Sequence, residues 1–419
     1  MVSSRAGTSR RAGWIAVLWL GGLLACSGAE AQSLVDVIRQ ALAQYPLVKS
    51  ARANAQGAQA ELDRAEAARW PVVNLGATAS QQDQAPQSLV ASPQVTYTVY
   101  AGGAIVAGIE RAQAGLRGAN SKTGATLDDV ALQAAEAYLG WGRSLQLLRL
   151  ATNNLRAHER IFNDIRAIVE VDPGRRVDLR QAELRVSAAR LIESQRQVDL
   201  VQARNRLARF AANPISTEPQ GLDVELGERP GGLEAAMAAA GDDHPVLAQA
   251  VAAVDVTTAA VVVARAQTRP KVDLSLVYQV NPYTLRPGIL AQLSASMPVF
   301  NGGAGTAGVE SAQAQRLAAI FALEEQRLAL RERIAAAWAE WDAAVLRESL
   351  NQGQTQAGDE LVSSYYEQFR LARRSLLDLL NVQSEAHGYA TAAVQSQFDR
   401  RVARYRLAAA TGTLALAAR

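Results

Sequence analysis

The chain has 419 residues, of which 49% are hydrophobic and only 5% aromatic, so alanine and aliphatic side chains must supply most of its core. This composition favours long packed helices over an ordinary globular core. The formal net charge is +3, and most of that excess comes from Arg5, Arg10 and Arg11, so the sequence does not indicate a nucleic-acid-binding surface.

Residues 1–31 are predicted to be a secretory signal peptide. A basic start is followed by the apolar segment WIAVLWLGGLLA and then by small residues, which is the order found in such signals. The apolar segment is too short to span a bilayer as a helix, which needs about 20 residues. Cleavage after Ala31 is one prediction; the alternative is a lipoprotein signal in which the only cysteine, Cys26, carries the lipid. Both alternatives predict export from the cytoplasm.

The chain contains two copies of one unit. RWPVVNL at residues 69–75 returns as TRPKVDL at 268–274, 199 positions later. VYAGGAIVAGIERAQA at residues 99–114 returns as VFNGGAGTAGVESAQA at 299–314, 200 positions later. Such self-similarity has to be recognised before any short motif is interpreted, because it predicts the architecture of the whole chain.

The repeat also decides how the glycine-rich stretch of the second copy is interpreted. Gly303, Gly305 and Gly308 have the spacing G-x-G-x-x-G, but Ile105 stands where Gly305 would be in the first copy. A dinucleotide-binding turn needs a short helix that returns to a parallel strand, and the segment that follows is far too long for that. The shared glycines are instead predicted to permit a sharp strand-to-helix junction through positive φ. They are Gly102, Gly103, Gly302 and Gly303.

The 13 prolines indicate where long helices can lie. None falls between residues 94 and 172 or after residue 298, and a proline inside a helix costs about 3 kcal/mol. Helices are therefore predicted over roughly 104–170 and 304–371, each about 100 Å long at 1.5 Å per residue. Antiparallel return helices are expected over roughly 175–211 and 374–413. Helices of this length need neighbours to pack against.

Two β-hairpins are predicted between the short and the long helices. In PVVNLGATAS, QVTYTVY and their second-copy counterparts, apolar residues alternate with polar or small ones over about 10 positions. Such alternation is typical of membrane β-barrel strands, although a half-buried hairpin of a soluble sheet shows it too. Four strands cannot close a barrel, and open strand edges do not persist in hydrocarbon. The chain is therefore expected to associate, with two copies giving eight strands or three giving 12.

Together these patterns predict a mostly α-helical chain with two internal repeats, long antiparallel helices and four β-strands. The expected segments are a signal peptide (1–31), N-terminal helices (32–70), a first β-hairpin (71–101), a first long helical hairpin (102–212), a linker (213–243), a repeat-two helix (244–269), a second β-hairpin (270–300) and a second long helical hairpin (301–414).

The mature chain resembles the TolC-type outer-membrane factors, over about residues 33 to 414. The doubled units above carry this resemblance together with GRRVDLRQAELRVSAAR and, most specifically, YYEQFRLARRSLLDLLNVQSEAHGYATAAVQSQFDRRVARYRLAAATGTL. The resemblance implies a homotrimer whose 12-stranded barrel in the outer-membrane lipid continues into a helical barrel across the periplasm. It also implies a periplasmic adaptor and an inner-membrane ABC or proton-driven pump as partners. Within the family, EQFRLARRSLLDLLN looks most like type I secretion members.

The resemblance also implies a gate at the periplasmic tip, where each helix pair turns over. Asp378 matches an acidic constriction residue, and Asn381 stands where some members have a second aspartate. Arg374 matches a basic residue that ties the tip shut, with Asp178 as its candidate partner. Phe369 occupies a position where members often carry a tyrosine that bonds between helix pairs, so that bond is expected to be absent or replaced by apolar contact.

The sequence does not indicate an enzyme, and no cofactor or metal is expected. The leading hypothesis is a passive outer-membrane exit duct for type I secretion or efflux. One alternative is the outer-membrane lipoprotein of a proton-driven multidrug pump. A different class of protein, a periplasmic coiled-coil adaptor without a pore, is also open, since it would bury its hairpins in soluble β domains.

Overall fold

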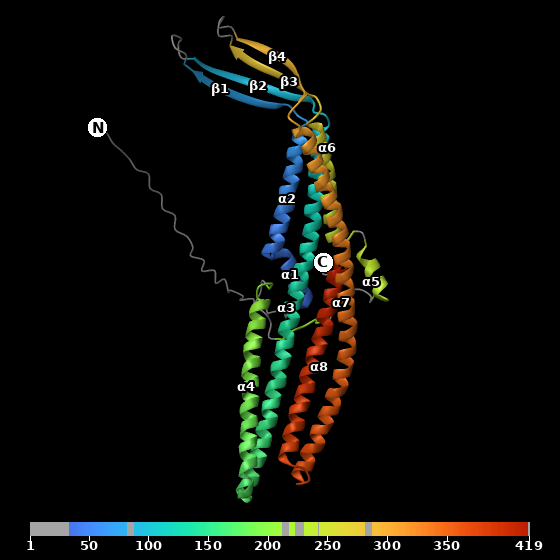
Figure 1. Ribbon diagram of the computed structural model, residues 1–419. Coiled ribbons are helices and arrows are strands. Elements are labelled where there is room, and N and C mark those ends of the chain that lie inside the picture. The colour runs from blue at the N-terminus through green and yellow to red at the C-terminus, as the bar shows by residue number, and fades with distance from the viewer. Residues whose placement is uncertain are drawn as a thin grey trace, which may run out of the picture.

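The computed structural model describes residues 33–81, 88–211, 218–222, 230–241, 243–280 and 287–417. The predicted signal peptide and Cys26 lie outside these residues. The molecule is long and narrow, with a small sheet at one end and two helical hairpins reaching to the other (Figure 1). Its helices are α1 (Leu34–Gln44), α2 (Pro46–Ala67), α3 (Ala104–Val171), α4 (Arg176–Leu207), α5 (Leu233–Ala240), α6 (Pro245–Ala266), α7 (Ala304–Arg370), α8 (Leu376–Ala410) and α9 (Leu414–Ala417).

The sheet has four antiparallel strands in the order β1-β2-β3-β4. They are β1 (Val72–Ser80), β2 (Ser88–Tyr100), β3 (Lys271–Val280) and β4 (Pro287–Ser296). The register places the alternating apolar residues on one face, in rows such as Val73, Val95, Leu276 and Ala291. The other face carries polar rows such as Thr98, Asp273 and Ser294, and Thr98 donates a 2.7 Å hydrogen bond to Asp273.

The apolar face of the sheet has no core beneath it. Leu75 is 78% exposed, Ile289 76% and Leu293 67%. A hairpin packed on a soluble domain would bury these side chains, because burial of each leucine contributes about 2 kcal/mol. The predicted alternation of an apolar and a polar face is confirmed.

Two strand boundaries differ from the prediction. β2 begins at Ser88, earlier than predicted, and runs through Pro93. At Pro93 the strand pairs with β1 but not yet with β3. The proline, which has no backbone N–H, therefore does not interrupt the pairing of β2 with β3. The alternating pattern of apolar and polar residues extends to Met297 in the sequence, but β4 ends one residue earlier, at Ser296. Pro298 lies just beyond this end and cannot donate to a ladder.

The long helices α3 and α7 have 68 and 67 residues and begin directly after the paired glycines. Gly103 has φ of 93° and Gly303 has φ of 84°, and the glycine before each also has a positive φ. These values lie in the left-handed region that only glycine adopts without cost, so the chain can turn from strand into helix within a few residues.

Helix α3 forms the backbone of the packing. It contacts α2 and α6 in the half nearer the sheet, and α4 and α8 in the other half (Figure 1). The largest core cluster lies near the middle of the molecule, where Tyr138 and Trp141 pack edge to face 5.4 Å apart. The Tyr138 hydroxyl also bonds the backbone of Gln220, which ties the segment after α4 to the core.

One described helix, α6, has the length and apolar composition of a membrane span. It packs instead along α3 and α7, and Arg117 of α3 forms a 2.9 Å ion pair with Asp255 in the middle of α6. Only 22% of its apolar window is buried in the single chain.

Candidate functional site

The two helical hairpins end in different turns at the pole opposite the sheet. After α3, the Asp172 side chain accepts a hydrogen bond from the Gly174 backbone, and a short 3₁₀ turn leads into α4. After α7, Ala372 adopts φ of 54°, a left-handed conformation that favours glycine. The amides of Ala372 and Arg373 bond back to Phe369 and Gln368, which is the Schellman pattern of a helix end.

Phe369 lies in an apolar cluster that joins all four helices at this tip. It is 5% exposed and packs with residues of both hairpins. The other buried members are Ile161, Ile165, Ala182, Leu376, Leu379 and Leu380. The aromatic ring therefore contributes packing between the hairpins, and its lack of a hydroxyl leaves no buried polar atom without a partner.

A hydrogen bond between the hairpins lies one helical turn before Phe369. The Tyr366 hydroxyl of α7 donates to the Asp164 carboxylate of α3 over 2.6 Å. This hydrogen bond, with burial as the second cause, raises the pKa of Tyr366. Sequence reasoning missed this pair because it looked for tyrosine only at position 369. The available signal was an acidic residue inside the apolar stretch IFNDIRAIV.

The predicted tie between Arg374 and Asp178 is not formed within this chain. Arg374 donates to the Gln368 side chain over 3.1 Å, and its guanidinium lies 4.5 Å from the centre of the Tyr365 ring. Asp178 instead pairs with Arg175 at 2.8 Å. Each charge thus finds a partner within its own turn.

Asp378 and Asn381 lie on the first turns of α8. The Asp378 backbone amide is capped by Ser375, and among the described residues its half-exposed carboxylate forms no ion pair. Asn381 accepts a 3.3 Å hydrogen bond from Arg185 of α4. Asn381 is thus a contact between the hairpins, while Asp378 keeps its negative charge available to solvent.

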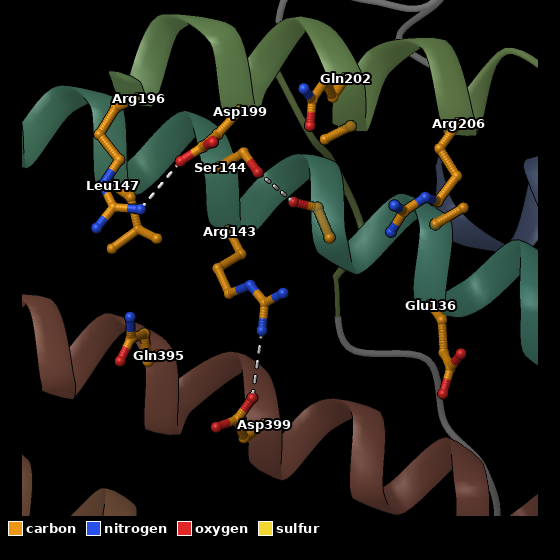
Figure 2. A pocket seen from close by; sticks show the side chains of 13 residues that line it. Glu136, Arg143, Ser144, Leu147, Arg196, Asp199, Gln202, Arg206, Gln395 and Asp399 are labelled. Atoms are coloured by element: carbon orange, nitrogen blue, oxygen red, sulfur yellow. Dashed lines mark hydrogen bonds and ion pairs between the residues drawn. The ribbon is translucent and has the colours of Figure 1, made fainter. Parts of the chain in front are cut away.

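A polar seam continues from the tip along the line where the hairpins meet. Its contacts are Asp164–Tyr366, Arg185–Asn381, Asn154–Gln383 at 3.4 Å and Arg143–Asp399 at 3.4 Å. Figure 2 shows the last of these inside a cleft of about 480 Å³ between α3, α4 and α8. Arg196 and Asp199 form a second ion pair in the cleft. The exposed Arg143–Asp399 pair can separate into water at low cost, unlike an apolar interface.

Two histidines, the buried His158 of α3 and the half-buried His387 of α8, lie along the seam. His158 of α3 is 4% exposed and its Nδ1 is without a hydrogen-bond partner. Burial, with Arg185 of α4 and His387 of α8 as further causes, lowers the pKa of His158 to about 4. Burial and Arg196 of α4 also lower the pKa of His387. Both imidazoles are therefore neutral at pH 7.

These histidines predict a loss of stability in acid. Because the unfolded chain takes up protons near pH 6.5 and the folded chain only near pH 4, stability falls as the pH drops through that window. We expect the melting temperature of the purified protein to fall by several degrees between pH 7 and pH 5. His158→Phe, which keeps a buried ring, should remove at least half of that change. An equal pH dependence in the variant would place the titrating groups elsewhere.

Among the described residues, no three or more His, Cys, Asp or Glu side chains are grouped so that they could hold a metal ion. The chemistry available at the tip and along the seam is that of charges, hydrogen bonds and packing. Such groups can hold two hairpins together, let them part, and select what passes between them.

Comparison with known proteins identifies the family of the fold. The model of the outer membrane efflux protein family matches residues 37–213 and 238–413, one match for each repeat. Protein CyaE of Bordetella pertussis is 27% identical over 336 residues, which cover 74% of this chain and 69% of CyaE. Outer membrane efflux protein BepC of Brucella suis is 25% identical over 289 residues, which cover 67% of this chain and 63% of BepC, slightly less than two thirds of its length.

Solved structures share the fold at lower identity. CusC superposes with a TM-score of 0.81 at 16% identity, covering 90% of this chain and 92% of CusC. The outer-membrane channel OprN gives 0.80 at 20%, with coverage of 91% and 90%. The open state of the MtrE outer-membrane channel of Neisseria gonorrhoeae gives 0.80 at 21%, with coverage of 91% and 89%.

Proposed function

The chain belongs to the outer membrane efflux protein family, and we propose that three copies of it assemble into one exit duct whose gate is the tip described above. It is a TolC-type outer-membrane channel, a transport protein without enzymatic activity, with a helical extension into the periplasm. Channels of this family assemble as trimers in tripartite systems. The assembly of this chain, its partners and its gate residues are the parts that we propose.

The open edges of the sheet support assembly. β1 and β4 each have a neighbour on one side only, and the face that would meet lipid is apolar. Unpaired backbone groups are too costly in hydrocarbon, so β4 of one subunit must meet β1 of the next. Three copies give about 12 strands, enough for a barrel with a passage.

Exposed apolar stripes on the helices support the same assembly. On α4, Val177, Leu184, Leu191 and Val198 recur at every seventh position and are 77%, 72%, 73% and 47% exposed. A stripe with this spacing is a coiled-coil seam without its partner helix. On α7, at the opposite edge of the chain in Figure 1, the exposed residues in the half nearer the tip include Leu346, Leu350 and Leu361. We place the α4 stripe of one subunit against α7 of the next.

The gate follows from the contacts at the tip. Tyr366–Asp164 and the Phe369 cluster hold the α7/α8 hairpin against the α3/α4 hairpin, and the seam beyond them is polar. Opening would be an untwisting of the α7/α8 hairpin that separates these contacts. Arg374 and Asp178 act within their own turns in this scheme, unless opening or assembly brings them to a neighbouring subunit.

Asp378 is the proposed selectivity residue. Three copies form a ring of carboxylates, which concentrates cations and repels anions. Asp378→Asn should lower the cation preference of the channel in planar bilayers at least twofold, and Asn381→Asp should raise it. Asp178→Asn is the matched control, because its charge is paired with Arg175 and should matter little. Unchanged selectivity in Asp378→Asn would remove this residue from the gate.

The proposed partners are a periplasmic adaptor and an inner-membrane pump, since channels of this family work in tripartite systems. We assign the pump to the ABC class of type I secretion because the tip segment EQFRLARRSLLDLLN resembles those members. Co-purification of the cross-linked channel tests this: an ABC transporter supports it, and a proton-driven pump contradicts it. The duct itself is tested by heat-modifiable migration, recovery in outer-membrane fractions and ion current through lipid bilayers.

A further inference from the structure

The first strand-to-helix turn is covered by the end of α6. Arg269 donates a 3.0 Å hydrogen bond from Nη1 to the Gly102 carbonyl. A Cβ added to Gly102 would lie 2.8 Å from the Arg269 Cβ and 3.0 Å from the Ala266 carbonyl. The turn of copy one is thus closed by a residue of copy two within the same chain.

The second turn has the same backbone and no cover. Gly302 has φ of 67° against 61° for Gly102, yet a Cβ added to Gly302 would meet nothing within 4 Å. The residues just before it, Val299 and Phe300, are 90% and 88% exposed. The same element is therefore packed at one position and bare at the other.

The internal repeat indicates what belongs there. Arg269 stands immediately before Pro270, and Trp70 stands immediately before Pro71, 199 positions earlier. Trp70 follows α2 as Arg269 follows α6, and it is 73% exposed. Within the chain, Arg269 of copy two covers the Gly102–Gly103 turn of copy one. In a closed ring of repeats, the equivalent residue of copy one, Trp70, should cover the Gly302–Gly303 turn of copy two. That contact has to come from another subunit.

We infer that Trp70 of one subunit lies over the Gly302–Gly303 turn of its neighbour, and that β4 pairs with the neighbour's β1 in the register that β2 has with β3. The inference rests on the assembly proposed above and specifies its seam. The indole presents a flat apolar face to Phe300 and Val299, and its N–H can donate to the Gly302 carbonyl as the Arg269 guanidinium does to Gly102. Tryptophan suits this level, where the barrel leaves the membrane.

The register of the proposed pairing follows from the two repeat offsets, which are 199 positions from β1 to β3 and 200 positions from β2 to β4. Gln94 lies opposite Val277 in the chain, so Ser294 should lie opposite Thr78 of the next subunit. Thr96 lies opposite Ser275, so Ser296 should lie opposite Gly76 of the next subunit. Thr78, Ser294, Ser296 and Gly76 all lie on the polar face of the sheet, so this register continues both faces across the seam.

Cysteine pairs test the register, because Cys26 in the predicted signal peptide is the only native cysteine. Directly opposed strand residues lie within disulfide range. In a Cys26→Ser background, Thr78→Cys with Ser294→Cys should give disulfide-linked dimers and trimers at least tenfold more than Thr78→Cys with Gln292→Cys. Gln94→Cys with Val277→Cys is the matched control and should cross-link within one chain. Efficient linkage of the Gln292 pair instead would overturn the register.

A second pair tests the cover over the turn. Trp70→Cys with Asn301→Cys, treated with a short bismaleimide, should link different chains, while Arg269→Cys with Ala101→Cys should link one chain to itself. Intact trimers that lack the cross-link between Trp70→Cys and Asn301→Cys would overturn the proposed contact. Labelling of Trp70→Cys by a lipid-phase maleimide would also overturn it, because it would place Trp70 in the bilayer. Absence of trimers in the cysteine-free protein would contradict the proposed assembly itself.

Discussion

Replacing Tyr366 by phenylalanine is expected to raise the resting conductance of the reconstituted channel at least tenfold. The change removes only the hydroxyl whose 2.6 Å hydrogen bond joins α7 to the Asp164 carboxylate of α3. Hydrogen bonds to charged groups contribute about 1.5–3 kcal/mol, and 1.4 kcal/mol corresponds to a tenfold change in an equilibrium constant. Because each subunit carries the contact, three such bonds hold the proposed gate closed.

Tyr365→Phe is the matched control for this experiment. Tyr365 is the adjacent residue, and its ring, not its hydroxyl, carries the contact with the Arg374 guanidinium. Its conductance should stay at the level of the unmodified channel. Asp164→Ala, which removes the acceptor, should open the channel about as far as Tyr366→Phe, and the double variant should add little, since both changes remove one interaction. Additive effects, or a Tyr366→Phe channel that stays closed, would show that the pair does not hold the gate.

The double variant Leu184→Glu with Leu191→Glu is expected to abolish the trimer. Both leucines lie on the exposed heptad stripe of α4, at 72% and 73% exposure in the single chain. Burial of a leucine contributes about 1.5–3 kcal/mol, and a glutamate in its place would carry an unpaired charge into the interface. Two such changes at each of three interfaces exceed what an assembly can lose. Sedimentation in detergent should show at least a tenfold loss of trimer and a matching loss of bilayer current.

Gln197→Glu is the control for this variant. It adds a negative charge at an exposed position of α4 that lies about a third of a turn away from the stripe. Trimers and current should persist in it, and circular dichroism should show the same helix content in both proteins. If trimers persist in the double leucine variant, the subunit interface does not include the exposed stripe of α4.

The sequence was sufficient to predict the long helices, the four strands and their order, but not the short helices α5 and α9. Proline-free intervals fix where helices of 68 and 67 residues can lie, and period-two alternation fixes which residues of the strands share a face. Because the chain is an internal repeat, the predictions of the long helices and of the strand faces in one half apply to the other half as well. These features depend on positions close together in the chain, where backbone sterics and side-chain period act directly. The strand ends at Ser88 and Ser296 were harder to place because neighbouring strands decide where a ladder stops.

Only the tertiary structure decided which charges and hydroxyls meet at the tip. Asp164 and Tyr366 are 202 residues apart, and Arg185 and Asn381 are 196 apart. Whether two such side chains touch depends on the rotation of one long helix against another, and one residue changes that rotation by about 100°. Sequence analysis expected only apolar contact at Phe369, where the structure has an apolar cluster, but it did not find the Tyr366–Asp164 bond, and it paired Arg374 with Asp178, where each has a local partner. Local chemistry determined the helices, and their packing angle determined which side chains meet at the tip.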